Sequence, residues 1–210
     1  MSPPAAGRSS DPAAGKATGR LSLSFEPLTP GRWRDLERLF GERGACGGCW
    51  CMYWRLKRSQ FVRQKGAGNK RAFRALVEAG AVPGILAYEG GQPIGWCAVG
   101  PRGSFPALER SRILKPLDDR PVWSITCFFV ARPYRRRGAS VQLLRAAADH
   151  VARRGACIVE GYPVEPRKGA MPDAFVWTGL SAAFRAAGFK EYQRRSATRP
   201  IMRREVSIGS

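Results

Sequence analysis

The 210-residue sequence has few acidic residues, one histidine and no long apolar run. Asp and Glu number 16 against 36 Lys and Arg, which gives a formal net charge of +20. Because no apolar stretch approaches the roughly 20 residues that span a bilayer, a membrane protein with a spanning helix is excluded. The N-terminus lacks the apolar segment of a signal peptide, and we therefore expect a cytoplasmic location.

Metal ligands are also scarce, and the cysteines do not resemble a disulfide framework. The six cysteines are expected to be reduced thiols, as in most cytoplasmic proteins. Cys46, Cys49 and Cys51 are close in sequence, but a structural zinc site needs about four ligands and His150 lies far along the chain. We therefore expect no metal.

The remaining composition is that of a globular protein, with 44% hydrophobic and 25% charged residues. Residues 1–20 are rich in Ser, Pro, Ala and Gly, which predicts a disordered tail, and residues 21–210 are predicted to form a single domain. The basic residues are spread along the chain without interleaved stacking aromatics. This pattern predicts a solvated surface, and we expect neither a nucleic-acid nor a membrane partner.

Hydrophobic periodicity predicts alternating strands and helices. Strands are predicted near residues 21–25, 85–88, 94–99, 122–130, 157–162, 192–195 and 198–203. Helices are predicted at residues 33–40, 69–80, 139–154 and 180–187, with Asn69 as an N-cap and one further turn near Leu108. A right-handed crossover would make the strands at 122–130 and 157–162 parallel.

The most informative segment is residues 127–140, where an apolar strand leads through Arg135, Arg136, Arg137 and Gly138 into a helix. Such a turn points several backbone N–H groups and the positive end of the helix dipole at one spot. Glycine lets the backbone approach an anion, and the arginines add positive charge. The segment predicts a phosphate site; the alternative is an ordinary strand-turn-helix with solvated arginines.

The same residues carry a family resemblance. Arg135-x-x-Gly138-x-Ser140 resembles the [QR]-x-x-G-x-[GA] loop of the GNAT superfamily of acetyl-CoA-dependent N-acetyltransferases, with Ser140 in place of the final Gly or Ala. Downstream, Phe184-Arg-Ala-Ala-Gly188-Phe189 resembles the family's Tyr-x-x-x-Gly-Phe segment. The resemblance covers residues 21–204 and is closest to uncharacterised bacterial members. It implies an α/β (α+β) fold with a mixed, mostly antiparallel sheet of about six or seven strands and about four helices.

The resemblance also implies acetyl-CoA as co-substrate, lying where the strand that ends at Val130 parts from the strand at 157–162. The backbone N–H of Phe128 would then polarise the thioester carbonyl. The implied cofactor-binding residues are Phe128, Phe129, Val130, Arg135, Arg136, Arg137, Gly138, Ala139, Ser140 and Trp177.

In many family members a tyrosine that protonates the leaving thiolate occupies the position of Phe184. Glu160 and Tyr162 share a face of their strand and are candidate base and acid, with Ser124 and Thr126 as holders of water. Ser181 on the last helix is another candidate acid. The alternative is that Glu160 forms an ion pair with a nearby arginine and that Tyr162 covers one end of the core. The thiolate of coenzyme A would then leave without a proton from a protein acid.

Residues 46–55 form a second unusual segment, rich in cysteines and aromatic residues. In GNAT folds this region borders the acceptor pocket, and aromatic rings suit a flat, apolar or cationic acceptor. The predicted acceptor-binding residues are Trp50, Cys51, Tyr53 and Trp54. The alternative is that the aromatic residues fill the core. For Cys46, Cys49 and Cys51, the sequence leaves three roles open: structural, redox-active or substrate-lining. Cys97 and Cys127 are predicted to be small buried hydrophobes.

The leading hypothesis is transfer of an acetyl group from acetyl-CoA to the primary amine of a small molecule, by direct attack in a ternary complex. One alternative is a protein acetyltransferase acting on a lysine or an N-terminus. The other is a non-catalytic module that binds an acyl-CoA or RNA as a sensor, which the phenylalanine at position 184 favours. A homodimer is left open.

Overall fold

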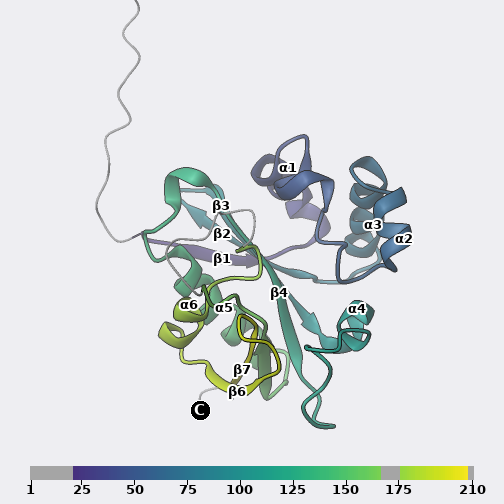
Figure 1. Cartoon of the computed structure of the whole chain (residues 1–210). Helices are drawn as coiled ribbons and strands as arrows, with labels where there is room; N and C mark the ends of the chain where they lie inside the picture. The colour runs from purple at the N-terminus through teal and green to yellow at the C-terminus, as the bar shows by residue number, and fades with distance from the viewer. Residues whose placement is uncertain (1–20, 167–175, 208–210) are drawn as a thin grey trace, which may run out of the picture.

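The computed structural model describes residues 21–166 and 176–207, and its centre is a seven-stranded sheet of order β1-β2-β3-β4-β5-β7-β6 (Figure 1). The strands are β1 (Ser24–Pro27), β2 (Gly84–Glu89), β3 (Gln92–Pro101), β4 (Trp123–Val130), β5 (Ile158–Gly161), β6 (Lys190–Arg194) and β7 (Pro200–Glu205). Neighbouring strands are antiparallel, except that β4 and β5 are parallel as predicted. The tail predicted for residues 1–20 and part of the loop predicted at 163–173 lie outside the described residues.

Helices cover both faces of the sheet (Figure 1). They are α1 (Trp33–Phe40), α2 (Arg58–Arg63), α3 (Ala67–Glu78), α4 (Pro106–Glu109), α5 (Ala139–Ala152) and α6 (Ser181–Ala186). Side chains alternate along each strand, so Trp96 and Cys127 pack on the side of α1 and α3. Cys97 and Phe128 point the other way, toward α5 and α6. The mixed, mostly antiparallel α/β class is therefore confirmed.

Strands β4 and β5 pair over a short distance and then separate. The register joins Trp123–Ile125 to residues 159–161, whereas β4 continues to Val130. Phe184 is fully buried at this fork, with its ring 5.9 Å from that of Phe128. A Cβ on Gly161 or on Gly179 would overlap the Phe184 ring. The two glycines therefore make room for a ring that fills the point where the strands part.

Several element boundaries differ from the sequence prediction. Helix α3 begins at Ala67, so Asn69 lies inside its first turn and is not the N-cap. The buried Asn69 amide instead donates to the carbonyls of Gly48, at 3.2 Å, and Phe61, at 3.4 Å, which ties the preceding loop to the helix. Helix α2 was not predicted because none of its residues is fully buried, and it therefore has no apolar period.

The fork gives a stability prediction. Gly161→Ala places a methyl group against the Phe184 ring, and overpacking of this kind costs about 1–3 kcal/mol. Urea unfolding should show that loss, whereas Gly103→Ala, where a Cβ meets no atom within 4 Å, should stay within about 0.5 kcal/mol of the wild type. Equal stability of the two variants would contradict the wedge role of Phe184.

Candidate active site

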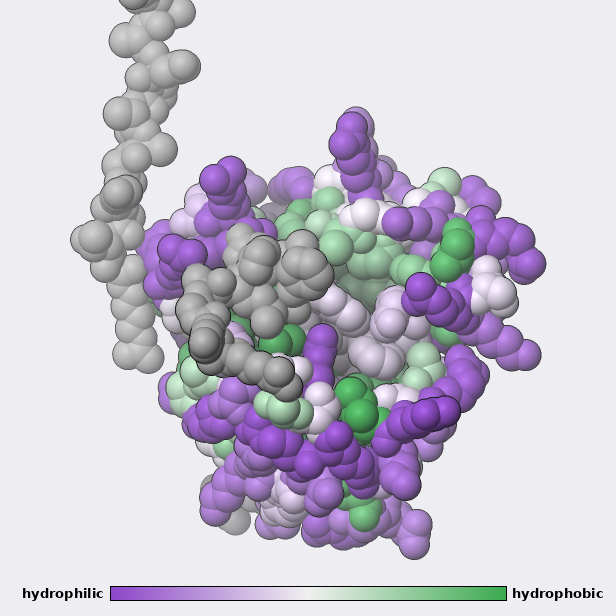
Figure 2. Space-filling model, in the orientation of Figure 1, coloured by the Kyte–Doolittle hydropathy of each residue, from purple (hydrophilic) through white to green (hydrophobic). Residues whose placement is uncertain are grey.

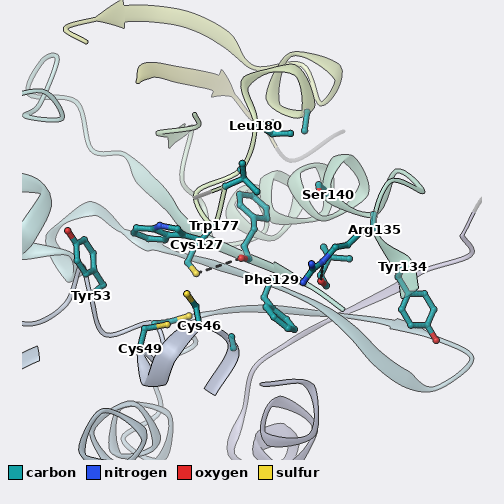
Figure 3. A pocket seen from close by; sticks show the side chains of 18 of the residues that line it. Cys46, Cys49, Tyr53, Cys127, Phe129, Tyr134, Arg135, Ser140, Trp177 and Leu180 are labelled. Carbon is teal, nitrogen blue, oxygen red and sulfur yellow. Dashed lines mark hydrogen bonds between the residues drawn. The ribbon is translucent and has the colours of Figure 1, made fainter. Parts of the chain in front are cut away.

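A pocket of about 950 Å³ opens at the fork and runs along the free part of β4 (Figure 3). Residues 127–130 of β4 form its middle, and residues 134–136 and 138–141 form one end. Arg137, which the sequence analysis placed with the cofactor-binding residues, does not line the pocket. Cysteines and aromatic side chains form the other end. Figure 2 shows a hollow in this face of the molecule, with pale and green residues inside it and hydrophilic residues around it. The pocket therefore joins a polar, cationic end to an apolar end.

The cationic end is the turn that begins α5. Gly138 is the N-cap with φ 80°, in the left-handed region, and Arg136 also has a positive φ of 59°. No side chain caps the helix, so the first N–H groups of α5 have no partner within the helix and no capping side chain. A Cβ on Gly138 would meet no atom within 4 Å. The turn thus offers open space and backbone donors to an anion, as the sequence indicates.

Two backbone groups on the free edge of β4 already have partners in the chain. The Phe128 N–H donates to the Trp177 carbonyl at 2.6 Å, and Arg135 Nε donates to the Val130 carbonyl at 2.8 Å. The expectation of a free Phe128 N–H is therefore corrected, because the Trp177 carbonyl occupies the place expected for an acyl oxygen. Trp177 does line the pocket. A ligand that pairs with β4 has to replace these contacts.

Four thiols line the apolar end: Cys46, Cys49, Cys51 and Cys127. Figure 3 shows the side chains of Cys46, Cys49 and Cys127 directed toward one another. Cys127 is buried in the core, as predicted, but it also lines the pocket, which the sequence analysis did not predict. The sequence signal for this position was that Cys127 directly precedes Phe128. Because side chains alternate along a strand, the Cys127 side chain lies on the face of the sheet opposite to that of Phe128.

The thiols differ in acidity. Hydrogen bonding from the Cys127 thiol, then from the indole N–H of Trp96, and the charge of Arg55 lower the pKa of Cys51, although burial opposes this. The distance from Trp96 Nε1 to Cys51 Sγ is 3.1 Å. Burial raises the pKa of Cys49 to about 11, and the hydrogen bond to Cys51 followed by burial raises that of Cys127. Cys51 is therefore the thiol of the three that ionises most easily.

Aromatic rings line the same end of the pocket. The Tyr53 ring makes edge contacts with Trp54 at 5.0 Å, Trp177 at 5.3 Å and Phe61 at 5.5 Å. Tyr53, Cys51 and Trp54 therefore lie where the sequence places them. Trp50 does not. Its side chain is 1% exposed and stacks on Trp33, so it belongs to the core, as the alternative interpretation had it.

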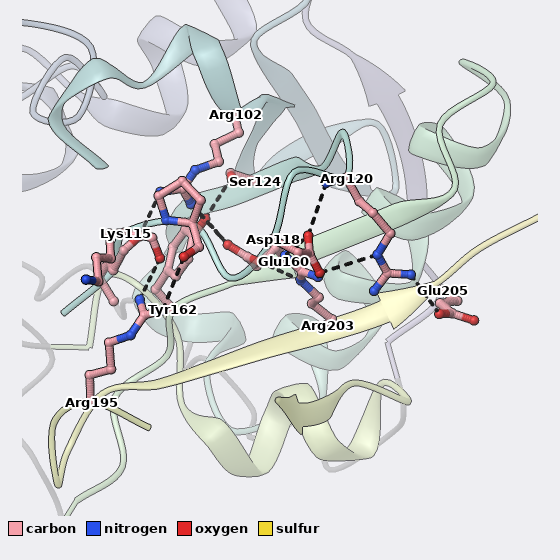
Figure 4. Close-up of polar contacts among 12 residues, drawn as sticks. Arg102, Lys115, Asp118, Arg120, Ser124, Glu160, Tyr162, Arg195, Arg203 and Glu205 are labelled. Atoms are coloured by element: carbon pink, nitrogen blue, oxygen red, sulfur yellow. Dashed lines mark hydrogen bonds and ion pairs between the residues drawn. The ribbon is translucent and has the colours of Figure 1, made fainter. Parts of the chain in front are cut away.

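Glu160, Tyr162 and Ser124 lie outside the pocket, in a buried network (Figure 4). Tyr162 donates to Glu160 Oε1 at 2.7 Å and lies 2.9 Å from Ser124 Oγ. Arg102 contacts the same carboxylate at 3.1 Å, and Arg203 contacts it at 2.6 Å. The expected catalytic roles are therefore corrected. Glu160 pairs with Arg102 and Arg203, and Tyr162 packs in the core.

The other candidate acids are also elsewhere. Thr126 and Ser181 are buried and do not line the pocket, and Ser181 Oγ donates to Glu165 Oε1 at 3.1 Å. Among the described residues that line the pocket there is no Asp, Glu or His. In the described part of the chain, no three Cys, His, Asp or Glu side chains are arranged to hold a metal. No described helix is long and apolar enough to cross a bilayer.

Comparison with known proteins decides the family. The sequence profile of the Acetyltransferase (GNAT) family matches residues 50–171, more than half of the chain. The chain belongs to the GNAT family of acetyltransferases. It is therefore an acyltransferase, and acetyl-CoA is the acyl donor of its family. The uncapped turn at Gly138 and the open space beside it fit the diphosphate of coenzyme A.

Two solved structures with TM-scores above 0.5 agree on the fold. A GNAT acetyltransferase from Listeria monocytogenes is 10% identical with a TM-score of 0.54, over 89% of this chain and 96% of that one. A protein described as a GNAT acetyltransferase from Desulfovibrio desulfuricans is 16% identical with a TM-score of 0.51, over 89% and 100%. The PaiA N-acetyltransferase from Thermoplasma acidophilum, solved with coenzyme A, is 13% identical with a TM-score of 0.47, over 88% and 99%. No curated protein matches the chain.

The network in Figure 4 predicts a large effect on stability and not on chemistry. Glu160→Gln removes the buried negative charge that Arg102 and Arg203 share, while Arg102 keeps Glu109 and Arg203 keeps Asp118, and it should cost about 1–3 kcal/mol. Glu109→Gln removes a carboxylate that contacts the same Arg102 but is half exposed, and should cost less than about 1 kcal/mol. Urea unfolding measures both. A stable Glu160→Gln protein that lacks activity would restore Glu160 to a catalytic role.

Proposed function

We propose that this GNAT protein acetylates the primary amine of a small molecule that has an aromatic or apolar body. One observation carries the proposal: a single pocket joins the turn at Gly138 to the thiols and aromatic rings beyond Phe128. Acetyl-CoA bound along β4 would place its diphosphate at the first end and its thioester at the second. The acceptor then shares the second end with the acyl group, as direct attack in a ternary complex requires.

The aromatic end supports a small acceptor over a peptide. Tyr53, Trp54 and Trp177 contact one another through ring edges and faces, so they form a continuous apolar wall. Such a wall suits an aromatic body by edge and face contact, or an amine by cation–π contact. A peptide would need an open groove with backbone partners, which this wall of rings does not provide.

The charge around the pocket supports an amine that reacts in its neutral form. Lys65, Arg135 and Arg136 line the pocket, and none of the described lining residues is acidic. The positive charge of these described residues lowers the pKa of a bound ammonium group. The pocket therefore favours the neutral amine, whose lone pair attacks a carbonyl carbon.

The proposal is tested in two steps with the full chain. Isothermal titration measures binding of acetyl-CoA, and release of coenzyme A thiol is then followed with a panel of amines. Small arylalkyl amines should give the highest kcat/KM, above aliphatic diamines and above peptides that carry a lysine or a free N-terminus. Fastest turnover on peptides would make the protein a peptide acetyltransferase, and binding without any turnover would make it a sensor.

Gly138 is predicted to be essential for coenzyme A binding. Gly138→Val fills the open space over the turn. Affinity for coenzyme A should therefore fall about tenfold or more, which is a loss of about 1.4 kcal/mol or more in binding free energy. Gly155→Val is the matched control, because Gly155 also has a positive φ of 76° and open space around its Cβ position. Both variants carry similar backbone strain, but only the first touches the pocket. Unchanged affinity in Gly138→Val would contradict the phosphate site.

Tyr53 is predicted to bind the acceptor and not the cofactor. Its side chain is partly exposed, so Tyr53→Ala should fold and should raise the KM for aromatic amines about tenfold with little change in acetyl-CoA affinity. Tyr192→Ala, an exposed tyrosine on β6 that is outside the pocket, should leave both constants unchanged. Steady-state kinetics with each substrate varied in turn separate these outcomes. Equal losses for both substrates would contradict the assignment.

A further inference from the structure

A lysine lines the acceptor end of the pocket, next to the aromatic rings. Phe61 of α2 and Lys65, which follows that helix, both line the pocket. The Phe61 ring contacts the Tyr53 ring at 5.5 Å. One short segment therefore brings an aromatic ring and an ammonium group to the end of the pocket where the proposed acceptor binds.

Contacts with the cysteine loop, residues 46–49, hold the segment of Lys65 in place. The Gly66 N–H donates to the Gly48 carbonyl at 3.0 Å. A Cβ on Gly48 would lie 2.7 Å from the Gly66 nitrogen, so the two backbones approach closely only because residue 48 is a glycine. A Cβ on Gly47 would lie 3.8 Å from Lys65 Nζ. The ammonium group therefore lies over the loop that carries two of the pocket thiols.

The charge of Lys65 is not paired with a carboxylate in the described part of the chain. Residues 57–77 contain seven basic residues and no acidic one. Lys70 of this segment meets Glu37 of α1 at 2.8 Å, but no ion pair among the described residues includes Lys65. None of the described residues that line the pocket is acidic. A carboxylate on the acceptor would therefore supply a counter-charge that these residues do not.

A second cation lies behind the same end of the pocket. The Arg55 guanidinium lies over the Phe105 ring at 4.3 Å, and its buried Nε has no hydrogen-bond partner in the described part of the chain. Burial lowers the pKa of Arg55 to about 10, so the group stays charged at neutral pH, and the charge of Cys51 opposes the shift. Arg55 does not line the pocket, but its charge acts on Cys51, which does. Two cations therefore make the potential at this end positive.

This positive potential selects among amines by their net charge. A simple arylalkyl amine is a cation in water, since an alkyl ammonium group has a pKa of about 10. A chain with a formal net charge of +20 and a cationic pocket repels such a cation. An amine that also carries a carboxylate has no net charge, and its carboxylate forms a charge-assisted hydrogen bond with a lysine. The carboxylate thus favours both entry and binding.

We propose that the acceptor is an aromatic amino acid, or another arylalkyl amine with a carboxylate, and that Lys65 binds that carboxylate. This inference rests on the proposed function and narrows its class of acceptor. The aromatic wall holds the ring of the acceptor, Lys65 holds its carboxylate, and the neutral amino group attacks the carbonyl carbon of the thioester. The N–C bond forms, the bond from the carbonyl carbon to the coenzyme A sulfur breaks, and the proton that the nitrogen loses ends on that sulfur. The products are an N-acetylated amino acid and the thiol of coenzyme A.

Pairs of acceptors that differ by one carboxylate test the inference. Phenylalanine is compared with phenethylamine, and tryptophan with tryptamine, by release of coenzyme A thiol with the full chain. In the wild type, kcat/KM should be about tenfold or more higher for the amino acid of each pair, which corresponds to one hydrogen bond between charged groups. Added salt should reduce this preference, because salt screens an exposed ion pair.

Variants of Lys65 decide the question, because the two members of a pair also differ in the basicity of their amines. Lys65→Gln should lower the preference for the amino acid about tenfold through a higher KM, while kcat/KM for the amine and the affinity for acetyl-CoA stay within about twofold. Lys65→Arg should keep most of the preference, and Lys65→Glu should reverse it. Lys57→Gln is the matched control, because Lys57 belongs to the same basic segment, is exposed and does not line the pocket. Lys65 is itself exposed, so its variants should fold.

The outcomes separate this inference from the proposed function. A wild type that favours the amines, an unchanged preference in Lys65→Gln, or an equal loss for both members of a pair overturns the inference, while turnover of the amines keeps the proposed function. A loss of acetyl-CoA affinity in Lys65→Gln would make the residue a cofactor contact and also overturns the inference. A wild type that acetylates no member of either pair contradicts both proposals.

Discussion

The separation of β4 from β5 is the constraint on which the rest of this structure depends. Two parallel strands satisfy each other's backbone groups as long as they stay paired, and the pairing here stops at Gly161. The Phe184 ring lies in the fork, against Gly161, Gly179 and Phe128. The ring occupies the position at which the family often has a catalytic tyrosine, but in this chain it is a wedge, because it is fully buried and does not line the pocket.

A fork leaves buried polar groups that need partners, and this chain supplies its own. The carbonyl of Trp177 and the guanidinium of Arg135 meet the Phe128 N–H and the Val130 carbonyl. Exchanging one hydrogen bond for another costs little net free energy, whereas leaving a buried N–H unpaired costs about 1–3 kcal/mol. The segment around Trp177 therefore satisfies the edge of β4 with contacts that another hydrogen-bonding partner could replace at little net cost.

The shortage of acidic residues affects both the surface and the pocket. With 36 basic residues against 16 acidic ones, many guanidiniums have no carboxylate to meet. Arg145 and Arg204 instead donate to the carbonyls of Ala186 and Ala187 at the end of α6. The buried carboxylate of Glu160 serves two arginines at once. Among the described residues at the apolar end of the pocket, the same shortage leaves thiols and the Tyr53 hydroxyl as the groups that can become negatively charged.

The sequence by itself determined the order of the strands, the order of the helices except α2, and the turn from Arg135 to Ser140 that begins α5, because periodicity and turn patterns are local. It also pointed to the segment of Tyr53 and Trp54, which lines the pocket, since that segment is unusual in composition. It could not decide between pocket and core for Trp50, Glu160 and Tyr162. Residues on one strand face are equivalent in sequence until a neighbour covers them, and Arg102 and Arg203 come from distant segments. Only the tertiary structure brought Cys127, Trp96 and Arg55 to Cys51, because hydrogen bonds and charges between separate elements exist only after the chain has folded.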